Sequence, residues 1–308
     1  MTQFTLPPSL EKYRFPEPIY VTRTRMPRLE DYTRKLEGLW ESHWITNDGE
    51  LHRELRSALQ SYLEVEHLSL CCNGTVALLI ALQAGGVSAG EVISAPFTFP
   101  VTPHAIYWNR ARPIFGDIDE KTFNIDPNQI ERHISPETRA ILGAHVFGNP
   151  CEVEAIQAIA EAHGLLVMYD AAHAMGVSYR GQSIMSFGEF LVVSFHATKL
   201  FTTGEGGAIV SESQAQRERV DFLKNFGIAD EETIIGPGIN GKMNEFQAAF
   251  GRLQLELLEQ EIADRRRLVE VYRDRLCGVP GISFQEDSTH IGHNYSYFPI
   301  QVCPRSTE

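Results

Sequence analysis

The stretches LLVMYDAAHAMG (residues 165–176) and FLVVSFHATKL (residues 190–200) each end a run of apolar residues on chemically active side chains. Short apolar runs that alternate with helical patterns are typical of crossover units around a largely parallel sheet. In such sheets, functional groups gather beyond the carboxyl ends of the strands. The two stretches therefore predict an α/β fold whose strand ends carry the functional side chains.

The rest of the chain keeps this alternation. Further strands are predicted in HLSLCC, EVISAP, RPIFGDI and RAILGAHVFG, each followed by a helical pattern. Helical spacing also predicts two helices before the first strand, around residues 29–40 and 51–62. The turn-rich loop WITNDGELH lies between them.

Near residues 236–241 the alternation of short apolar runs with helical patterns ends, and we place the predicted domain boundary there. A long helical pattern runs from Met243 to about Leu276, and the strand-like stretch NYSYFPIQV follows it. We therefore predict a large domain over residues 1–238, which includes the N-terminal helices, and a smaller C-terminal domain over residues 239–308.

The amino-acid composition limits which classes of partner and which cellular compartment we expect for the protein. The 308 residues carry a formal net charge of −13 with only 27 Lys and Arg, which argues against binding to nucleic acid or to an anionic membrane. Five cysteines, with one adjacent pair and no CxxC spacing, indicate a reducing compartment. The N-terminus does not resemble a signal peptide and no apolar run has membrane-spanning length, so the expected location is the cytoplasm. No residue is assigned to a metal site.

Two predicted strand ends suit a phosphorylated ring. Asn73, Gly74 and Thr75 begin a helix and offer free backbone N–H groups, a hydroxyl and the positive end of the helix dipole, which suit a phosphate. The alternative is a plain N-cap with a glycine turn. Phe99 follows the EVISAP strand, where it could stack on a ring or pack in the core.

Two further strand ends carry the candidates for chemistry. Asp170 closes an apolar strand, so its carboxylate needs a cation or a strong donor unless it is only a helix cap. His173 follows it, either as a functional group or as a satisfied core histidine. The glycines of GEGG fit neither a P-loop nor a dinucleotide fingerprint, so nucleoside triphosphate hydrolysis is not supported. The other strand end delivers four functional side chains in a single turn: Ser194, His196, Thr198 and Lys199.

Pyridoxal 5'-phosphate (PLP) accounts for all four strand ends. Its aldehyde forms a Schiff base with a lysine, and its pyridine nitrogen is kept protonated by a carboxylate. Its phosphate needs N–H and hydroxyl donors, and its ring needs packing on both faces. Each signal is weak alone, but their order along the chain predicts a PLP enzyme in which Lys199 carries the cofactor.

Six stretches follow one another in the order NGTVALLIAL, PFTFPVT, HVFGNPCEVEAI, YDAAHAMG, SFHATKLFTTGEGGAIV and GINGKMNEFQAAFGRLQL. Together they resemble the DegT/DnrJ/EryC1/StrS family of sugar-nucleotide aminotransferases over nearly the whole chain. The resemblance implies the aspartate-aminotransferase-like PLP fold type I, with a large cofactor-binding domain, a smaller C-terminal domain and an obligate homodimer.

The resemblance also implies roles for individual residues. Lys199 matches the Schiff-base lysine, Asp170 the partner of the pyridine nitrogen, and His173 a Gln or His near the ring hydroxyl. Phe99 matches an aromatic residue that stacks on the ring. Asn240 matches an asparagine that reaches the phosphate of the neighbouring subunit's cofactor. Three residues match phosphate ligands: Gly74, Thr75 and Ser194.

The resemblance further implies the reaction. Glutamate is the expected amino donor, and Lys199 is the expected base that moves the donor's proton. YDAAHAMG, NGKMNE and NYSYFPI are most similar to the branch that aminates carbon 4 of dTDP-4-keto-6-deoxyglucose. Its product is dTDP-4-amino-4,6-dideoxyglucose, used for O-antigen or exopolysaccharide. Contacts to the sugar nucleotide are expected from Thr46, Asn47, His196 and Lys242.

Other functions stay open at this point. They are amination at carbon 3, amination of a GDP- or UDP-linked ketosugar, and a PLP-binding relative without activity. A dehydratase that uses PLP has histidine in place of the lysine, so Lys199 argues against it. A doubly wound protein without PLP is the remote alternative. The chain stops at VCPRSTE, where members of the family continue, so the small domain is expected to be incomplete.

Overall fold

The centre of the molecule is a mixed sheet. A computed structural model describes residues 11–230 and 232–303. In these residues, seven strands form the sheet in the order β1-β9-β8-β5-β4-β2-β3. Neighbouring strands are parallel except that β9 is antiparallel to both β1 and β8. The strands are β1 (Leu68–Cys71), β2 (Glu91–Ser94), β3 (Arg112–Phe115), β4 (Thr138–Ala144), β5 (Leu166–Asp170), β8 (Phe190–Ser194) and β9 (Gly207–Ser211).

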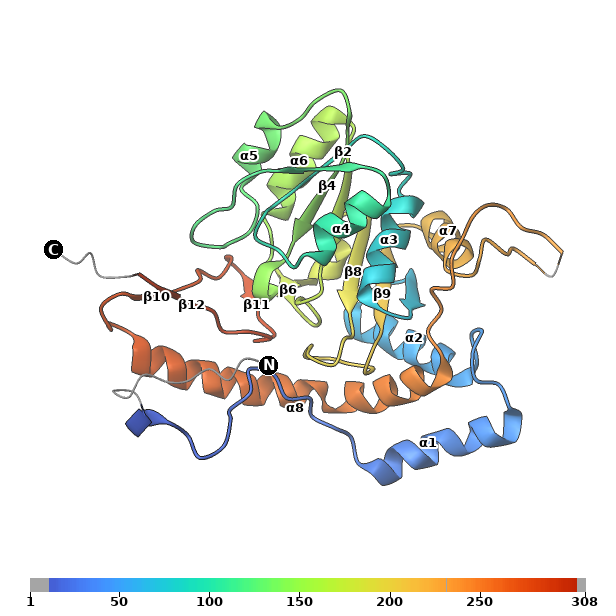
Figure 1. Cartoon of the computed structure of the whole chain (residues 1–308), viewed down its shortest axis with the longest axis horizontal. Coiled ribbons are helices and arrows are strands. Elements are labelled where there is room, and N and C mark those ends of the chain that lie inside the picture. Colours follow the sequence, from blue (N-terminus) through green and yellow to red (C-terminus); the bar gives the residue numbers. More distant parts are fainter. Residues whose placement is uncertain (1–10, 231, 304–308) are drawn as a thin grey trace.

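Helices cover both faces of this sheet, which confirms the predicted α/β fold with a mostly parallel sheet (Figure 1). One face carries α3 (Gly74–Ala84), α4 (Val101–Trp108) and α7 (Gln214–Leu223). The other face carries α2 (Glu50–Leu63), α5 (Pro127–Arg132), α6 (Val153–His163) and the long α8 (Glu245–Leu276). Below them α1 (Leu29–Ser42) packs against α8. The helices predicted before the first strand and after Met243 are confirmed.

Alternation along each strand separates two cores. In β8, Phe190 and Val192 belong to the cluster under α3, α4 and α7, whereas Leu191 and Val193 belong to the cluster under α2, α6 and α8. Because both faces of the strand are buried, its sequence reads as the continuous apolar run FLVV. A continuous apolar run such as FLVV therefore marks a strand that is buried on both faces.

The first turn of α2 is capped from another helix. Its N-cap residue, Gly49, makes no side-chain hydrogen bond. The carboxylate of Glu245, the first residue of α8, accepts the N–H groups of Leu51 at 2.8 Å and of His52 at 3.2 Å. Glu245 is fully buried. Because a carboxylate satisfies free N–H groups and faces the positive end of the helix dipole, Glu245 ties α2 to α8.

The strand predicted in NYSYFPIQV is wrong for residues 294–299. Only its end forms a strand, β12 (Ile300–Val302), which pairs with β10 (Ile282–Phe284). The Asn294 side chain donates to the carbonyls of His173 and Met175 and accepts the N–H of Ser296. These bonds offer the backbone an alternative to a strand ladder, so the segment stays irregular.

Short elements complete the described chain. A second small sheet runs in the order β11-β6-β7, and three 3-10 helices occur in the loops. These elements are β6 (Ser178–Tyr179), β7 (Gln182–Ser183), β11 (Ile291–Gly292), η1 (Glu11–Tyr13), η2 (Val146–Gly148) and η3 (Ile184–Ser186).

The domain division at residues 238 and 239 stays a prediction. The first part of α8, through Ala248, Ala249 and Leu258, and Met243 just before it share a core cluster with the central sheet. Residues 1–10 of the predicted large domain and residues 304–308 of the predicted small domain lie outside the described residues. Most of the VCPRSTE stretch therefore has no structural account.

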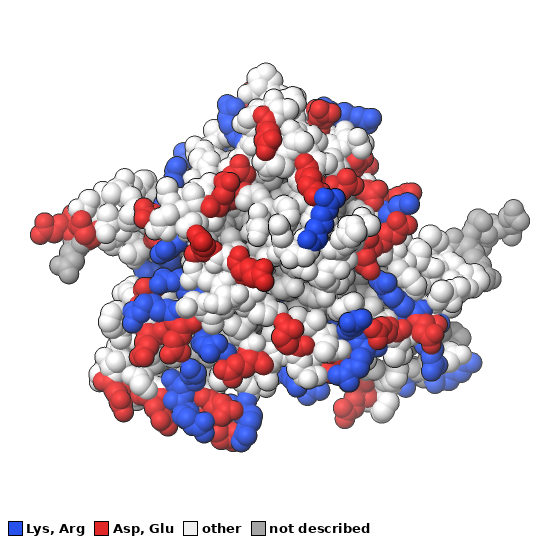
Figure 2. Space-filling view, turned by 180° about the vertical axis from the view of Figure 1, so that it is seen from behind, with Lys and Arg blue, Asp and Glu red and all other residues white. Residues whose placement is uncertain are grey.

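Acidic and basic side chains are interspersed over the surface. Figure 2 shows both kinds side by side on the rear face, most densely toward its lower edge. Along α8 they form four ion pairs at helical spacing: Arg252–Glu256, Arg265–Glu261, Arg266–Glu270 and Arg267–Asp264. Within residues 11–230 and 232–303, no helix has both the length and the apolar character needed to cross a membrane.

Removal of the Glu245 carboxylate should destabilise the fold. Glu245→Ala leaves the N–H groups of Leu51 and His52 without their acceptor, so we expect urea unfolding to show a loss of about 2 to 3 kcal/mol. Glu256 is the matched control, because it is exposed on the same helix and lies 3.7 Å from Arg252. Glu256→Ala should cost less than about 1 kcal/mol. Equal losses in the two variants would contradict the capping role.

Candidate active site

Asp170 ends β5 with its carboxylate buried, at 7% exposure. Its Oδ2 accepts the hydroxyl of Thr102 at 2.8 Å, and its Oδ1 accepts the N–H of Ala172 at 3.1 Å. Burial raises the pKa of Asp170, while these two donors and the charge of Lys199 act in the opposite direction. The carboxyl group is thus buried and accepts two hydrogen bonds that favour its charged form.

Lys199 lies in the loop after β8, close enough to Asp170 for each charge to affect the other's pKa. Burial lowers the pKa of the Lys199 ammonium, and the charge of Asp170 partly offsets this. A lowered pKa raises the fraction of neutral amine, which is the nucleophilic form of lysine. The pair predicted at the ends of β5 and β8 is therefore brought together.

His173 lies in the turn after β5, and its ring is a neutral acceptor at Nδ1. Burial lowers the pKa of His173 to about 3. Its Nδ1 accepts the N–H of Phe147 at 3.2 Å, so the proton of the neutral ring is on Nε2. The Phe147 ring stacks parallel to the imidazole, and Tyr297 packs beside it with 4.6 Å between ring centroids. His173 thus presents one N–H donor from a fixed ring.

The start of α3 forms a cradle against the end of β8. Asn73 caps the helix by accepting the N–H of Val76 at 2.8 Å, and the first-turn N–H groups of Gly74 and Thr75 have no intrahelical acceptor. A Cβ at Gly74 would lie 3.1 Å from Oγ of Ser194. The start of α3 and the end of β8 thus approach so closely that glycine suits position 74, and this approach brings the three predicted phosphate ligands together.

Glycine is also needed on the opposite side of this cradle. A Cβ at Gly207, in the GEGG stretch, would lie 2.8 Å from the backbone nitrogen of Gly74. Lys199 precedes that stretch along the chain. The glycines after the lysine thus let β9 pass close to the start of α3.

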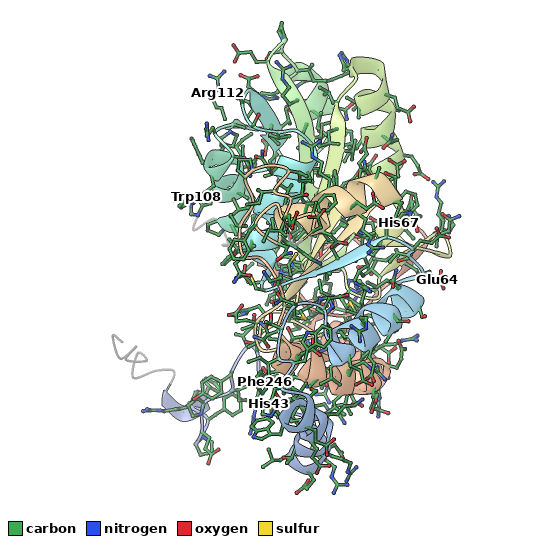
Figure 3. All side chains as sticks on the ribbon, turned by 90° about the vertical axis from the view of Figure 1, so that its right-hand side faces the viewer. His43, Glu64, His67, Trp108, Arg112 and Phe246 are labelled. Atoms are coloured by element: carbon green, nitrogen blue, oxygen red, sulfur yellow. The ribbon has the colours of Figure 1, made fainter. Side chains whose placement is uncertain are left out.

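Phe99 precedes α4 and is 72% exposed, so it is not a core residue in this chain. It lies on the loop after β2, which also carries Thr98. At the far end of α4, Trp108 projects outward from the molecule (Figure 3). The aromatic side chain predicted to stack on a ring is thus available at the surface.

Among the remaining predicted residues, His196 contacts the Asp170 and Lys199 pair only through its backbone carbonyl, which accepts the N–H of Lys199 at 2.9 Å. No described contact joins Lys242 or Asn240 to the pair. His196 is exposed and bonds to Thr198, with 2.9 Å between Nδ1 and Oγ1. The Lys242 amine donates to Asn225 at 2.8 Å and lies over the Phe226 ring. Asn240 forms a backbone bridge to Asn225.

Thr46 and Asn47 belong to the loop between α1 and α2. The carbonyl of Thr46 accepts the indole N–H of Trp44 at 2.5 Å, and Asn47 has a left-handed backbone with φ of 62°. The carbonyl of Ile45 accepts the N–H of Glu245 at 3.0 Å, which places this loop at the start of α8. Their predicted role in substrate binding stays a prediction.

Three residues of the site were missed by the sequence analysis. Thr102 donates to Asp170, Phe147 holds His173, and Tyr297 packs against the same ring. Each lies inside a stretch already singled out: PFTFPVT, HVFGNPCEVEAI and NYSYFPI. For Thr102, the available signal in the sequence was its position three residues after Phe99, in a helix that begins at Val101.

The family model of the DegT/DnrJ/EryC1/StrS aminotransferases matches residues 28–308. The chain belongs to this family. The resemblance inferred from the six stretches is therefore confirmed, and the aminotransferase class with it.

Curated relatives of the aminotransferase share its sequence over most of its length. It is 46% identical over 287 residues to dTDP-4-amino-4,6-dideoxy-D-glucose transaminase from Escherichia coli, covering 92% of this chain and 76% of the relative. It is 47% identical over 286 residues to the protein of the same name from Shigella dysenteriae, covering 93% and 78%. GDP-perosamine synthase from Caulobacter vibrioides is 34% identical over 263 residues, covering 82% and 71%.

Solved structures share the fold. The crystal structure of DesI in the presence of its TDP-sugar product superposes with a TM-score of 0.89 at 34% identity, covering 94% of this chain and 73% of that one. The structure of ntda from Bacillus subtilis with bound cofactor PMP has a TM-score of 0.82 at 28% identity, covering 89% and 63%. These neighbours confirm the predicted fold class.

The buried His173 should make the aminotransferase less stable in acid. The unfolded His binds a proton near its ordinary pKa of 6.5, whereas the folded His does so only near 3, so unfolding takes up a proton between these values. Stability contributed by the neutral ring is complete above pH 6.5 and falls as the pH drops toward 3. His173→Gln should flatten this slope of unfolding free energy against pH by about one proton. An unchanged slope would show that His173 is charged in the folded state.

Proposed function

We propose that the aminotransferase moves an amino group from glutamate to carbon 4 of dTDP-4-keto-6-deoxyglucose, giving dTDP-4-amino-4,6-dideoxyglucose, with PLP as cofactor. The observation that carries the proposal is the identity of 46% and 47% to two transaminases named for that product. The GDP-perosamine synthase is less similar, at 34%, which does not favour a GDP-linked sugar. The product suits O-antigen or exopolysaccharide synthesis.

The residues present fit PLP. The cradle of Gly74, Thr75 and Ser194 offers backbone N–H groups and hydroxyls close together, which suits a phosphate. The buried anion Asp170 suits the protonated pyridine nitrogen. Lys199 has an amine with a lowered pKa, which suits bonding to an aldehyde. When bound, PLP supplies an aldehyde carbon and an electron-withdrawing ring.

In this proposal each residue of the site has a separate task. Lys199 would hold the cofactor through its amine, and the same amine would serve as the general base that takes the proton from the donor α-carbon. Asp170 keeps the pyridine nitrogen protonated in both half-reactions. His173 donates its Nε2 proton toward the ring hydroxyl, and its orientation is held by the N–H of Phe147. Phe99 covers the ring.

The proposal includes a homodimer with shared sites. Asn240 reaches the partner's cofactor phosphate by family resemblance. The loop before it exposes apolar side chains, with Ile234 at 72% and Ile235 at 57% exposure, and α4 exposes Trp108 at 79%. Large exposed apolar side chains such as these favour a surface that binds another protein. A second copy of the chain is the occupant we propose.

The function is tested by supplying the purified protein with PLP, glutamate and dTDP-4-keto-6-deoxyglucose. Mass spectrometry should detect the 4-amino sugar nucleotide, and carbon 3 ketosugars or GDP-linked ketosugars should react more slowly. Lys199→Ala should lower turnover about a thousandfold or more, because it removes both the attachment point and the base. Borohydride reduction should label Lys199 only in the wild type.

The matched control for that variant is Lys224→Ala. Lys224 is buried, pairs with Asp221 at 2.7 Å and lies in no predicted contact with cofactor or substrate. Thermal unfolding separates a loss of fold from a loss of chemistry in both variants. A Lys199→Ala enzyme with wild-type turnover, or a wild type that prefers a GDP-linked ketosugar, would contradict the proposal.

Subunit mixing tests the shared site. Lys199→Ala and Asn240→Ala each inactivate a homodimer in this proposal, but a mixed dimer carries one site with both residues intact. We expect mixing to restore up to about a quarter of wild-type turnover, since half of the dimers are mixed and each has one good site. No recovery by dimers shown to exchange subunits, or a fully active monomer in sedimentation, would exclude shared sites.

A further inference from the structure

Two threonine hydroxyls form a chain that ends on Asp170. The Oγ1 atoms of Thr98 and Thr102 lie 2.8 Å apart, and the Thr102 hydroxyl lies 2.8 Å from Oδ2 of Asp170. Thr102 is fully buried, and Asp170 is 7% exposed. Both distances are normal for hydrogen bonds between oxygens. The chain therefore joins the loop after β2 to the end of β5 through the interior.

The direction of these hydrogen bonds follows from the acceptor at their end. An ionised carboxylate only accepts, so Thr102 must donate its single proton to Asp170. Thr102 then accepts from Thr98, which leaves Thr98 as the outer donor. Hydrogen bonds in series polarise one another, so the second threonine strengthens the bond of the first. Both hydroxyls thus favour the charged form of Asp170.

The same loop also carries the exposed ring of Phe99. Thr98 and Phe99 are adjacent, and the carbonyl of Phe99 accepts the N–H of Thr102 at 3.0 Å. Thr102 is the second residue of α4, whose N-cap, Pro100, makes no side-chain hydrogen bond. A short turn therefore holds the hydroxyl chain and the aromatic ring in one fixed arrangement.

We propose that Thr102, supported by Thr98, is a positioning residue that keeps the Asp170 carboxylate ionised and oriented for the pyridine nitrogen of PLP. The inference rests on the proposed function, in which Asp170 pairs with that nitrogen. Each carboxylate oxygen already accepts one bond, Oδ2 from Thr102 and Oδ1 from the N–H of Ala172. The remaining lone pairs are those available to a cofactor.

The titratable groups around Asp170 are few among the described residues. Lys199 comes from the loop after β8 and favours the charged carboxylate, and His173 lies in the turn after β5 with a neutral ring. At the end of β4, the backbone N–H of His145 donates to the Asp170 carbonyl, while its ring accepts the N–H of Cys151. From α4 the facing group is the Thr102 hydroxyl itself.

The positioning role predicts a pH-dependent effect on PLP binding. Loss of the Thr102 donor raises the pKa of Asp170 further, in the direction in which burial already moves it. Below that pKa the carboxyl must lose its proton before it can pair with a protonated pyridine, so binding weakens. Above it, free and bound protein lose the same hydrogen bond and the effect cancels. A loss that came only from packing would be equal at all pH values.

The experiment is a titration of the cofactor-free protein with PLP, followed by absorbance, from mildly acidic to alkaline pH. Thr102→Val keeps the side-chain shape and removes the hydroxyl. We expect it to weaken PLP binding about tenfold or more at mildly acidic pH, with the difference fading at alkaline pH. Thr102→Ser restores the donor and should restore the wild-type profile. Thr98→Val should shift the profile the same way but less.

The matched control is Thr138→Val. Thr138 is buried at the start of β4, and its hydroxyl accepts the N–H of Ser135 at 2.9 Å, so it reports the general effect of removing a buried hydroxyl. Its PLP profile should equal that of the wild type. Thermal unfolding shows whether each variant is folded. If Thr102→Val does not fold, the PLP-binding profile of Thr98→Val tests the positioning role in its place.

Failure of this inference and failure of the proposed function give different results. A wild type that binds no PLP overturns both. A wild type that binds PLP, with a Thr102→Val profile that is unchanged or uniformly weakened, overturns only the positioning role. If Thr102→Val does not fold, an unshifted Thr98→Val profile overturns it.

Discussion

The carboxylate of Asp170 lies at the end of the apolar strand β5, where burial opposes its ionisation. Without compensation, a carboxyl there would take up a proton and lose its charge. The surrounding structure supplies that compensation from three elements. Thr102 donates from α4, Ala172 donates from the turn after β5, and Lys199 adds its charge from the loop after β8. The site depends on this one buried charge.

The order of the strands makes these three contributions meet. β5 lies between β4 and β8 and is parallel to both, so their carboxyl ends share one edge of the sheet. Asp170, Lys199 and the turn at Phe147 follow these three strands. The antiparallel strand β9 then returns from the Lys199 loop and passes the start of α3 at Gly207. The start of α3 thus lies against the end of β8 because β9 runs antiparallel between β1 and β8.

One strained backbone position lies at this edge. Phe147 has a left-handed backbone with φ of 58°, an arrangement that is costly for a residue with a bulky side chain. In that conformation its N–H reaches Nδ1 of His173 while its ring stacks on the imidazole. Asn294 donates to the carbonyl of His173 from the C-terminal segment. His173, whose ring keeps one free N–H donor, is therefore held by Phe147 and by Asn294.

Local sequence pattern was enough to predict six of the seven strands of the central sheet, most of the helices and the candidate residues Asp170 and Lys199, but not β9 or α7. Burial on both faces produces apolar runs such as FLVV, and a charged residue at the end of such a run, like Asp170, stands out because its burial needs a partner. Only the tertiary structure decided which residue that partner is. Thr102 lies 68 positions away and reaches Asp170 because β2, which precedes α4, pairs with β4 and β4 pairs with β5. The same holds for NYSYFPIQV, whose apolar pattern predicts a strand but whose Asn294 bonds to distant carbonyls instead. Periodicity is a property of neighbours in sequence, whereas strand order and side-chain partners depend on long-range packing that no local pattern records.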